Sequence, residues 1–163
     1  MDAVQKTWLF GIILGIIGIV VGGGIFIAIT LKTGMIIGFA AILVGAIAGG
    51  GFGLGYKLGN GKFKDKPDVQ RFLAVATIFG LLGMFAAYFG PYIFLFAPKG
   101  INLALYLSAV GFGIRDILFI AIGAFGGRWA GKSLAKLIIM KQITEKAPDK
   151  FTEEIRKADR KLK

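Results

Sequence analysis

The chain has 163 residues, and 56% of them are hydrophobic although its 26 glycines are not counted in that figure. Soluble domains carry about 45–50% apolar residues with glycine included, so this composition indicates an integral membrane protein. Histidine and cysteine are absent, which excludes disulfides, thiol nucleophiles and the metal sites that need those side chains. We attribute the net charge of +11 to membrane orientation and anionic lipid headgroups, and not to nucleic acid.

Three stretches without a charged residue predict three transmembrane helices. They cover residues 7–31, 33–56 and 72–98 and are 25, 24 and 27 residues long. Each exceeds the roughly 20 residues that a helix needs to cross a hydrocarbon core about 30 Å thick. We expect the helices at about 7–31, 33–56 and 72–97.

The region after Gly100 is expected to contain a fourth span. The run 101–113 is too short to cross a bilayer and is predicted to lie at the interface or to re-enter the membrane. A fourth helix is expected at about 114–131, continuing as an amphipathic helix to residue 140. In the alternative topology, segments 103–120 and 117–140 form a helical hairpin, although no turn residues separate them.

These helices make up a transmembrane domain, residues 1–140, which is followed by a basic tail, residues 141–163. From Ala147 onward the tail has its acids early and its bases late, an order that complements the helix dipole. The fold class we predict is an all-α polytopic membrane protein. It has four transmembrane helices with glycine-zipper packing and a short cytoplasmic amphipathic C-terminal helix.

Basic residues predict the orientation. Lys6, the loop 57–71 and the tail after Gly127 carry 17 of the 20 Lys and Arg residues. By the positive-inside rule, both termini and that loop are cytoplasmic, in a multi-pass protein of the cell membrane. The first apolar block is longer than a signal-peptide core and lacks a cleavage site, so we expect it to remain as a helix.

The same charges suggest contacts with anionic lipid headgroups, although their role in orientation is enough to explain them. The loop contains the run Gly59-Asn60-Gly61-Lys62. The candidate lipid contacts are Lys57, Lys62, Lys64, Lys66, Arg71, Arg128, Lys132 and Lys136.

Glycines repeat at helical spacing and predict helix faces without side chains. Such faces allow close backbone approach, which drives helix association in lipid. They serve either packing inside one bundle or an oligomer whose strips meet around a pore. A shift of 78 residues superimposes the strip of the second helix on that of the fourth, which suggests a weak tandem repeat. The glycines are Gly11, Gly15, Gly18, Gly22, Gly45, Gly49, Gly53, Gly123, Gly127 and Gly131.

Residues 126–133 match GxxxxGK[ST], the phosphate-binding P-loop pattern. That motif needs a strand–loop–helix turn whose backbone N–H groups are free to meet phosphates. Here the match lies at the end of a predicted transmembrane helix, where those groups are already bonded. We expect no nucleotide binding.

Arg115 and Asp116 form a charge pair at the predicted start of the fourth helix. An acid in a first turn is favourable against the helix dipole, and an arginine there can reach outward to the interface. The alternative is that Asp116 lines an aqueous cavity as an ion or solute site, since intramembrane acids are costly without a role.

Gly90-Pro91 should kink the third helix, because proline removes a backbone hydrogen bond. Aromatic residues gather around this point, as expected for a belt at the outer interface. Trp8 and Trp129 stand where anchors belong on the cytoplasmic side. The predicted belt is Phe85, Tyr88, Phe89, Tyr92, Phe94 and Phe96.

The run TGMIIGFAAILVGAIAGGGFGLG, the basic loop after it and the helix entry Arg115-Asp116-Ile117-Leu118-Phe119 resemble a known family. That family consists of small, uncharacterised prokaryotic four-helix membrane proteins with a glycine-rich second helix. The similarity covers about residues 7–133. The resemblance implies the four-helix fold and topology, and no activity.

No catalytic constellation, metal cluster or cofactor motif emerges from the sequence, so we do not expect an enzyme. We expect an accessory or scaffold subunit of a membrane complex, acting through its glycine faces. Its partners would be anionic headgroups and either other membrane subunits or further copies of itself. The alternative is a small homo-oligomeric channel or transporter with Asp116 and Arg115 near its outer mouth.

Overall fold

The computed structural model describes residues 3–33, 38–109 and 111–161; at residues 3, 30, 31, 33, 38, 39, 94, 95 and 146–161 it describes the backbone alone. The backbone of these residues is helical apart from short connections. The elements are α1 (Ala3–Thr33), α2 (Gly38–Leu58), α3 (Lys66–Pro91), the π-helical turn η1 (Tyr92–Phe96), the 3₁₀ turn η2 (Ala97–Lys99), α4 (Leu103–Ala109) and α5 (Ile114–Lys161).

Three described segments are long and apolar enough to cross a membrane: Val4–Ile29, Ala40–Leu58 and Lys66–Pro91. A fourth span exists if α4 and the part of α5 from Ile114 to Glu145 count as one, although 94° separates their axes. The chain therefore has the all-α architecture predicted for a membrane protein, with three candidate spans and at most four in its described part. Helices suit this environment because each satisfies its backbone groups internally.

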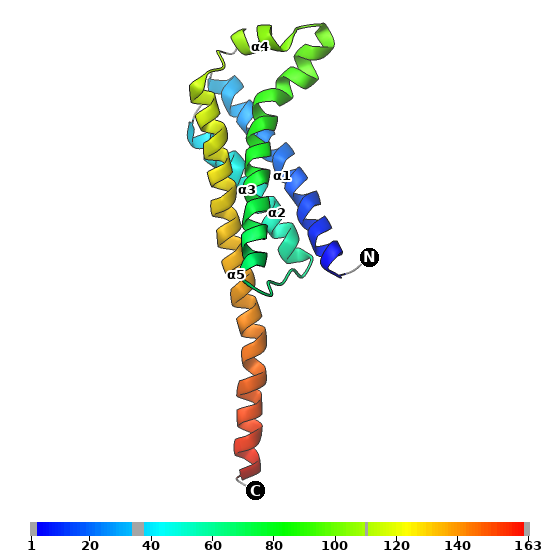
Figure 1. Ribbon diagram of the computed structural model, residues 1–163, viewed down its shortest axis with the longest axis vertical. Coiled ribbons are helices and arrows are strands. Elements are labelled where there is room, and N and C mark those ends of the chain that lie inside the picture. Colours follow the sequence, from blue (N-terminus) through cyan, green and yellow to red (C-terminus); the bar gives the residue numbers. More distant parts are fainter. Residues whose placement is uncertain (1–2, 34–37, 110, 162–163) are drawn as a thin grey trace.

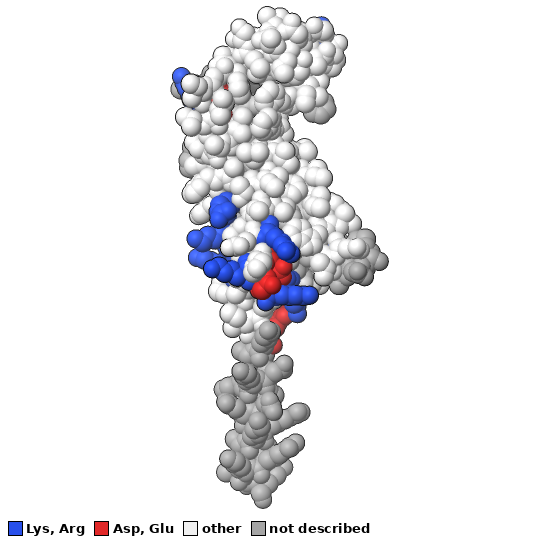
Figure 2. Space-filling view, in the orientation of Figure 1, with Lys and Arg blue, Asp and Glu red and all other residues white. Residues whose placement is uncertain are grey.

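The four long helices lie side by side as a bundle (Figure 1). Helices α2 and α3 contact each other and both contact α1 and α5, which lie on opposite sides of them. Helix α4 lies across one end of the bundle, which we call the α4 end. At the other end the loop between α2 and α3 turns, and α5 continues past it. We call this second end the basic end, because Lys and Arg form a band across it on the face shown in Figure 2.

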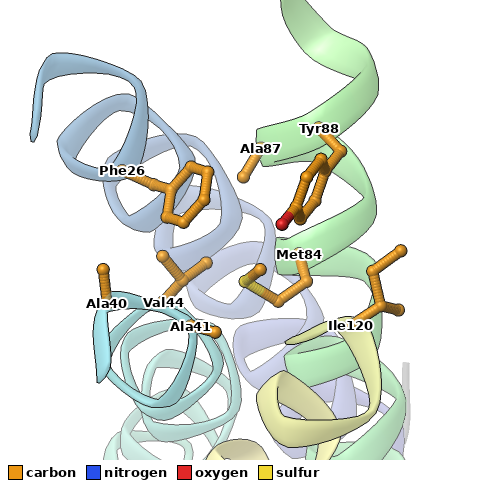
Figure 3. Packing of buried hydrophobic residues seen from close by; sticks show 8 residues of the cluster. All are labelled: Phe26, Ala40, Ala41, Val44, Met84, Ala87, Tyr88 and Ile120. Atoms are coloured by element: carbon orange, nitrogen blue, oxygen red, sulfur yellow. The ribbon is translucent and has the colours of Figure 1, made fainter. Parts of the chain in front are cut away.

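The interior holds two clusters of buried apolar side chains. The cluster near the α4 end combines small alanines with a few larger side chains from all four long helices (Figure 3). It consists of Phe26, Ala40, Ala41, Val44, Met84, Ala87, Tyr88 and Ile120. The cluster nearer the basic end is richer in aromatic rings: Phe52, Tyr56, Phe72, Ala76, Phe79, Ala135 and Ile138.

Large apolar side chains also cover the outside of the bundle. On α1, Ile16, Ile17 and Val20 are exposed, whereas Gly15 and Gly18 between and beside them are buried. Exposed aliphatic residues also lie on α3 and α5, for example Ile78 and Leu118. A surface of this kind would aggregate in water and is stable against lipid tails.

Helix α3 begins earlier and ends earlier than the sequence led us to expect. Asp65 caps it by accepting a hydrogen bond from the Asp68 amide at 2.9 Å, and Asp68 in turn accepts from the Lys64 amide at 3.1 Å. Reciprocal caps of this kind satisfy donors at a helix start, so the helix begins before the charged Arg71 at which the apolar run stops. At the other end, the π-helical turn η1 follows Pro91 directly.

The region from 101 to 161 also differs from the expectation in detail. Gly111, at φ +66°, belongs to the turn that separates α4 from α5, so the hairpin of segments 103–120 and 117–140 does not form. Helix α5 then runs 48 residues without a break, and the tail is the end of this helix instead of a separate short one. The second helix was expected to start near residue 33, but Thr33 is the last residue of α1 and α2 begins at Gly38; residues 34–37 lie outside the described residues.

Candidate functional site

Asp116 lies in the first turn of α5 and is buried, with 6% of its surface exposed. Its Oδ2 accepts a hydrogen bond from the Gly113 amide at 2.8 Å, just before the helix begins. Its Oδ1 accepts a second bond, at 2.9 Å, from the hydroxyl of Tyr88 on α3. The carboxyl group thus both caps α5 and joins it to α3.

The Tyr88 bond belongs to a small network at the α4 end. The Tyr106 hydroxyl, on α4, donates to the Tyr88 carbonyl at 2.8 Å, and the Tyr106 ring packs against those of Tyr92 and Phe96. This network ties α4 to the end of α3. Arg115 is exposed and is not among the residues of this network.

Tyr88 and Tyr106 are the site residues that sequence reasoning missed. The sequence predicts Tyr88 to belong to an outer aromatic belt, but in the structure it is buried and points to the bundle interior (Figure 3). A tyrosine hydroxyl inside a membrane needs a partner, and the nearby acid of the last helix was the available signal. Phe85 is exposed and stacks on Phe89, whereas the side chain of Phe94 lies outside the described residues.

The predicted glycines of α1 face α2 and α3 of the same chain. A Cβ atom built on Gly18 would lie 2.7 Å from the Ile47 carbonyl oxygen, and one on Gly15 would lie 2.5 Å from the ring of Phe79. Gly22 approaches the Val44 carbonyl and Gly11 approaches the Phe52 ring. Any side chain at Gly18 would meet backbone, which cannot move aside cheaply.

The two strips related by the 78-residue shift meet each other. Gly45 contacts the carbonyl of Gly123, and a Cβ on Gly49 would lie 2.5 Å from the Cα of Gly127. Gly127 also faces α3, where the Ala76 carbonyl lies 2.5 Å from its Cβ position. The strips part at their ends: Gly53 faces Leu134, and Gly131 faces Ala76.

The P-loop match lies inside α5, within an unbroken helix. Its amides therefore do not form the turn that a phosphate cradle requires. Within the described residues, no three acidic side chains come together as a metal site.

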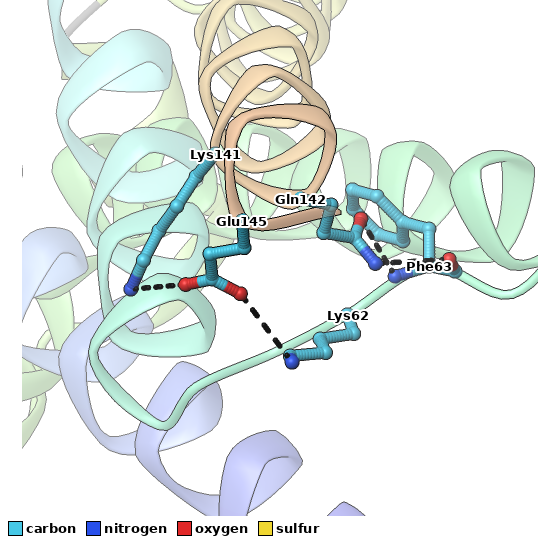
Figure 4. Close-up of polar contacts among 5 residues, drawn as sticks. All are labelled: Lys62, Phe63, Lys141, Gln142 and Glu145. Atoms are coloured by element: carbon cyan, nitrogen blue, oxygen red, sulfur yellow. Dashed lines mark hydrogen bonds and ion pairs between the residues drawn. The ribbon is translucent and has the colours of Figure 1, made fainter. Parts of the chain in front are cut away.

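At the basic end, hydrogen bonds and an ion pair join the α2–α3 loop to α5 (Figure 4). The Gln142 side chain accepts from the Phe63 amide at 3.3 Å and donates to the Phe63 carbonyl at 3.2 Å. The Glu145 carboxyl lies 3.5 Å from the Lys62 ammonium and 3.7 Å from that of Lys141. These ion pairs are exposed, while the amide pair is partly buried, so the amide pair fixes the loop more firmly.

The basic residues named from the sequence lie on the α2–α3 loop, on the neighbouring turns of α2 and α3, and along α5. Lys62 and Lys64 lie on the loop, and Lys66 and Arg71 lie on the first turns of α3. Arg128, Lys132 and Lys136 are exposed along α5, and Lys57, at the end of α2, is half-buried. Trp8 packs against Phe52 and Tyr56, whereas Trp129 is 61% exposed.

No protein-family model matches the chain, and neither a curated protein nor a solved structure shows significant similarity to it. Function has to be argued from the geometry itself.

Proposed function

We propose that the protein is a non-enzymatic integral membrane protein that serves as an accessory or scaffold subunit of a membrane complex. It crosses the cell membrane four times, with α5 as the fourth span and α4 at the outer interface. Both termini and the α2–α3 loop face the cytoplasm, as the band of basic residues at one end favours (Figure 2). Anionic headgroups meet this band.

The observation that carries the proposal is how the polar and small residues of the bundle are used. All ten predicted packing glycines approach other helices of the same chain. Both oxygens of Asp116 are occupied by donors from the chain. The glycine faces and the Asp116 carboxyl group are thus used inside the bundle, and this favours a role in packing and association over catalysis.

A partner would then meet the outer face of α1 and not the glycine faces. Only 28% of the α1 span is buried inside the bundle, against 50% for α2 and 44% for α3. Ile13, Ile17 and Val20 are among its exposed side chains, on a helix that touches α2 and α3 by its glycine side. We assign this face to a transmembrane helix of a partner subunit.

Photo-crosslinking in the native membrane tests this assignment. A photoreactive residue at Ile17, which is 54% exposed, is compared with one at Ile78 on α3, which is 53% exposed. We expect position 17 to capture another polypeptide and position 78 to capture lipid. Lipid adducts alone at both positions would contradict the proposal, and adducts between copies would favour the alternative below.

The alternative is a homo-oligomeric channel or transporter with Asp116 and Arg115 near its outer mouth. The observation in its favour is that Asp116 is the one buried acid among the described residues. In liposomes, Asp116→Asn should abolish ion or solute flux if this alternative holds. A scaffold would keep its crosslink at position 17 in the same variant.

A further inference from the structure

We propose that a cavity at the basic end binds the phosphate-bearing headgroup of an anionic phospholipid. The cavity measures about 620 Å³ and lies between the first turns of α1 and the α2–α3 loop. Its lining includes Lys6, Trp8, Phe10, Asn60, Lys62 and Lys64. The positive-inside rule predicts only that Lys6 and the loop lie on the same side of the membrane, and the structure brings them to one cavity although more than fifty residues separate them.

The described charged residues of the lining favour an anion. Three are lysines, and one, Asp68, is an acid whose carboxyl already accepts a bond from the Lys64 amide. The Lys62 ammonium is 3.5 Å from Glu145, but both side chains are well exposed, so an incoming phosphate competes with a weak pair. Lysines bind phosphate as point charges that adjust to its position.

The wall of the cavity is shaped before a ligand arrives. The Thr7 hydroxyl donates to the Gly59 carbonyl at 2.6 Å, which fastens the loop to α1. The Tyr56 hydroxyl donates to the Lys62 carbonyl at 3.2 Å, and Asn60 adopts a left-handed conformation at φ +60°. Because the loop is already ordered, a ligand does not lose affinity by ordering it.

The apolar part of the lining selects a lipid over a soluble phosphate. Val4, Phe10 and Leu58 also line the cavity, and Phe10 is 40% exposed on the outer surface of α1. A headgroup in the cavity would therefore have the start of its acyl chains beside these apolar side chains.

Tryptophan fluorescence of the full chain in mild detergent provides the test. Trp129→Phe leaves Trp8, in the cavity wall, as the only tryptophan. Phosphatidylglycerol with brominated acyl chains should quench Trp8 saturably, and brominated phosphatidylcholine should need about tenfold more lipid. Equal quenching by the two lipids would overturn the proposal.

Two triple variants that lose the same charge distinguish lipid binding in this cavity from nonspecific attraction of anionic lipid to basic residues elsewhere. In Lys6→Gln/Lys62→Gln/Lys64→Gln we expect the preference for the anionic lipid to fall about tenfold or more. In Arg128→Gln/Lys132→Gln/Lys136→Gln, whose residues do not line the cavity, we expect the preference to remain. An equal loss in both would overturn the proposal. Lys6→Gln alone, at an exposed position, should give a smaller loss in the same direction even if the triple variant folds poorly.

Competition with inorganic phosphate distinguishes the two possible ligands, a lipid headgroup and a soluble phosphate. At millimolar concentration it should displace little of the brominated anionic lipid if the acyl chain contributes to binding. The outcome that would overturn the lipid as the ligand is full displacement of the brominated lipid by phosphate. If this displacement is lost in the Lys6/Lys62/Lys64 variant and kept in the Arg128/Lys132/Lys136 variant, the cavity binds a soluble phosphate instead. These measurements are made without any partner subunit, so they succeed or fail independently of the role proposed for α1.

Discussion

At the α4 end of the bundle Asp116 is buried and its carboxyl group receives two hydrogen bonds, whereas at the basic end the side chain of Glu145 is 46% exposed and its carboxyl group lies beside two lysines. The first acid is held by neutral donors from rigid backbone and a buried tyrosine. The second is held by long side chains that water also reaches. The comparison teaches that an acid and its neighbouring charge in the sequence, such as Arg115 beside Asp116, need not be partners in the fold.

The largest loss of stability is expected from a substitution in the middle of the bundle, between its two ends. In Gly49→Ala the new Cβ would lie 2.5 Å from the Gly127 Cα and 2.7 Å from the Ala76 carbonyl oxygen. Backbone on two sides cannot yield, so we expect the free energy of unfolding to fall by about 3 kcal/mol. Unfolding by SDS in mixed micelles, followed by circular dichroism, measures this. Gly24→Ala, with nothing within 4 Å, is the control and should leave stability unchanged.

Removing the buried acid should have the next largest effect. Asp116→Ala leaves the Gly113 amide and the Tyr88 hydroxyl without their acceptor, and we expect a loss of about 2–3 kcal/mol in the same unfolding assay. Tyr88→Phe removes one of the two bonds and should cost about 1 kcal/mol. A loss in Asp116→Ala no larger than that in Tyr88→Phe would show that the cap at Gly113 contributes nothing.

At the basic end the strongest link is the amide pair between Gln142 and Phe63. Gln142→Ala removes two hydrogen bonds that are partly buried, so we expect about 1 kcal/mol less stability and faster hydrogen exchange at the Phe63 amide. Exchange measured by NMR reads this out at one residue. Thr144→Ala, which loses only a bond to its own helix at Met140, should leave the Phe63 amide protected.

The exposed ion pairs of Glu145 should contribute least. Glu145→Gln is expected to change the free energy of unfolding by less than about 0.5 kcal/mol, because water and salt screen both pairs. Repeating the measurement at high ionic strength should remove even this difference. A loss comparable with that of Asp116→Ala would mean that the exposed acid stabilises the bundle as strongly as the buried one, which contradicts the comparison.

The sequence was a good guide wherever one helix alone determined the answer. Apolar runs predicted where helices such as α1 lie, since length and composition decide whether a segment can cross a bilayer. It was a poorer guide where two segments meet. The inward orientation of Tyr88 depends on Asp116, 28 residues later, and the Thr7–Gly59 bond spans 52 residues. Neither contact leaves a periodic signal in the sequence. The cap at Asp65 likewise starts α3 among charged residues, which a search for uncharged stretches excludes.

The glycine contacts between α2 and α5 have a consequence for the entropy of assembly. Where Gly45 meets Gly123 and Gly49 meets Gly127, no side chain rotamer is frozen when the helices come together. Glycine ordinarily costs a helix backbone entropy, but a segment already helical in the membrane has lost that freedom before it meets its neighbour. At these glycines, docking of the two helices therefore restricts little beyond their rigid-body motion, so that even weak dispersion forces between the backbones add to stability there.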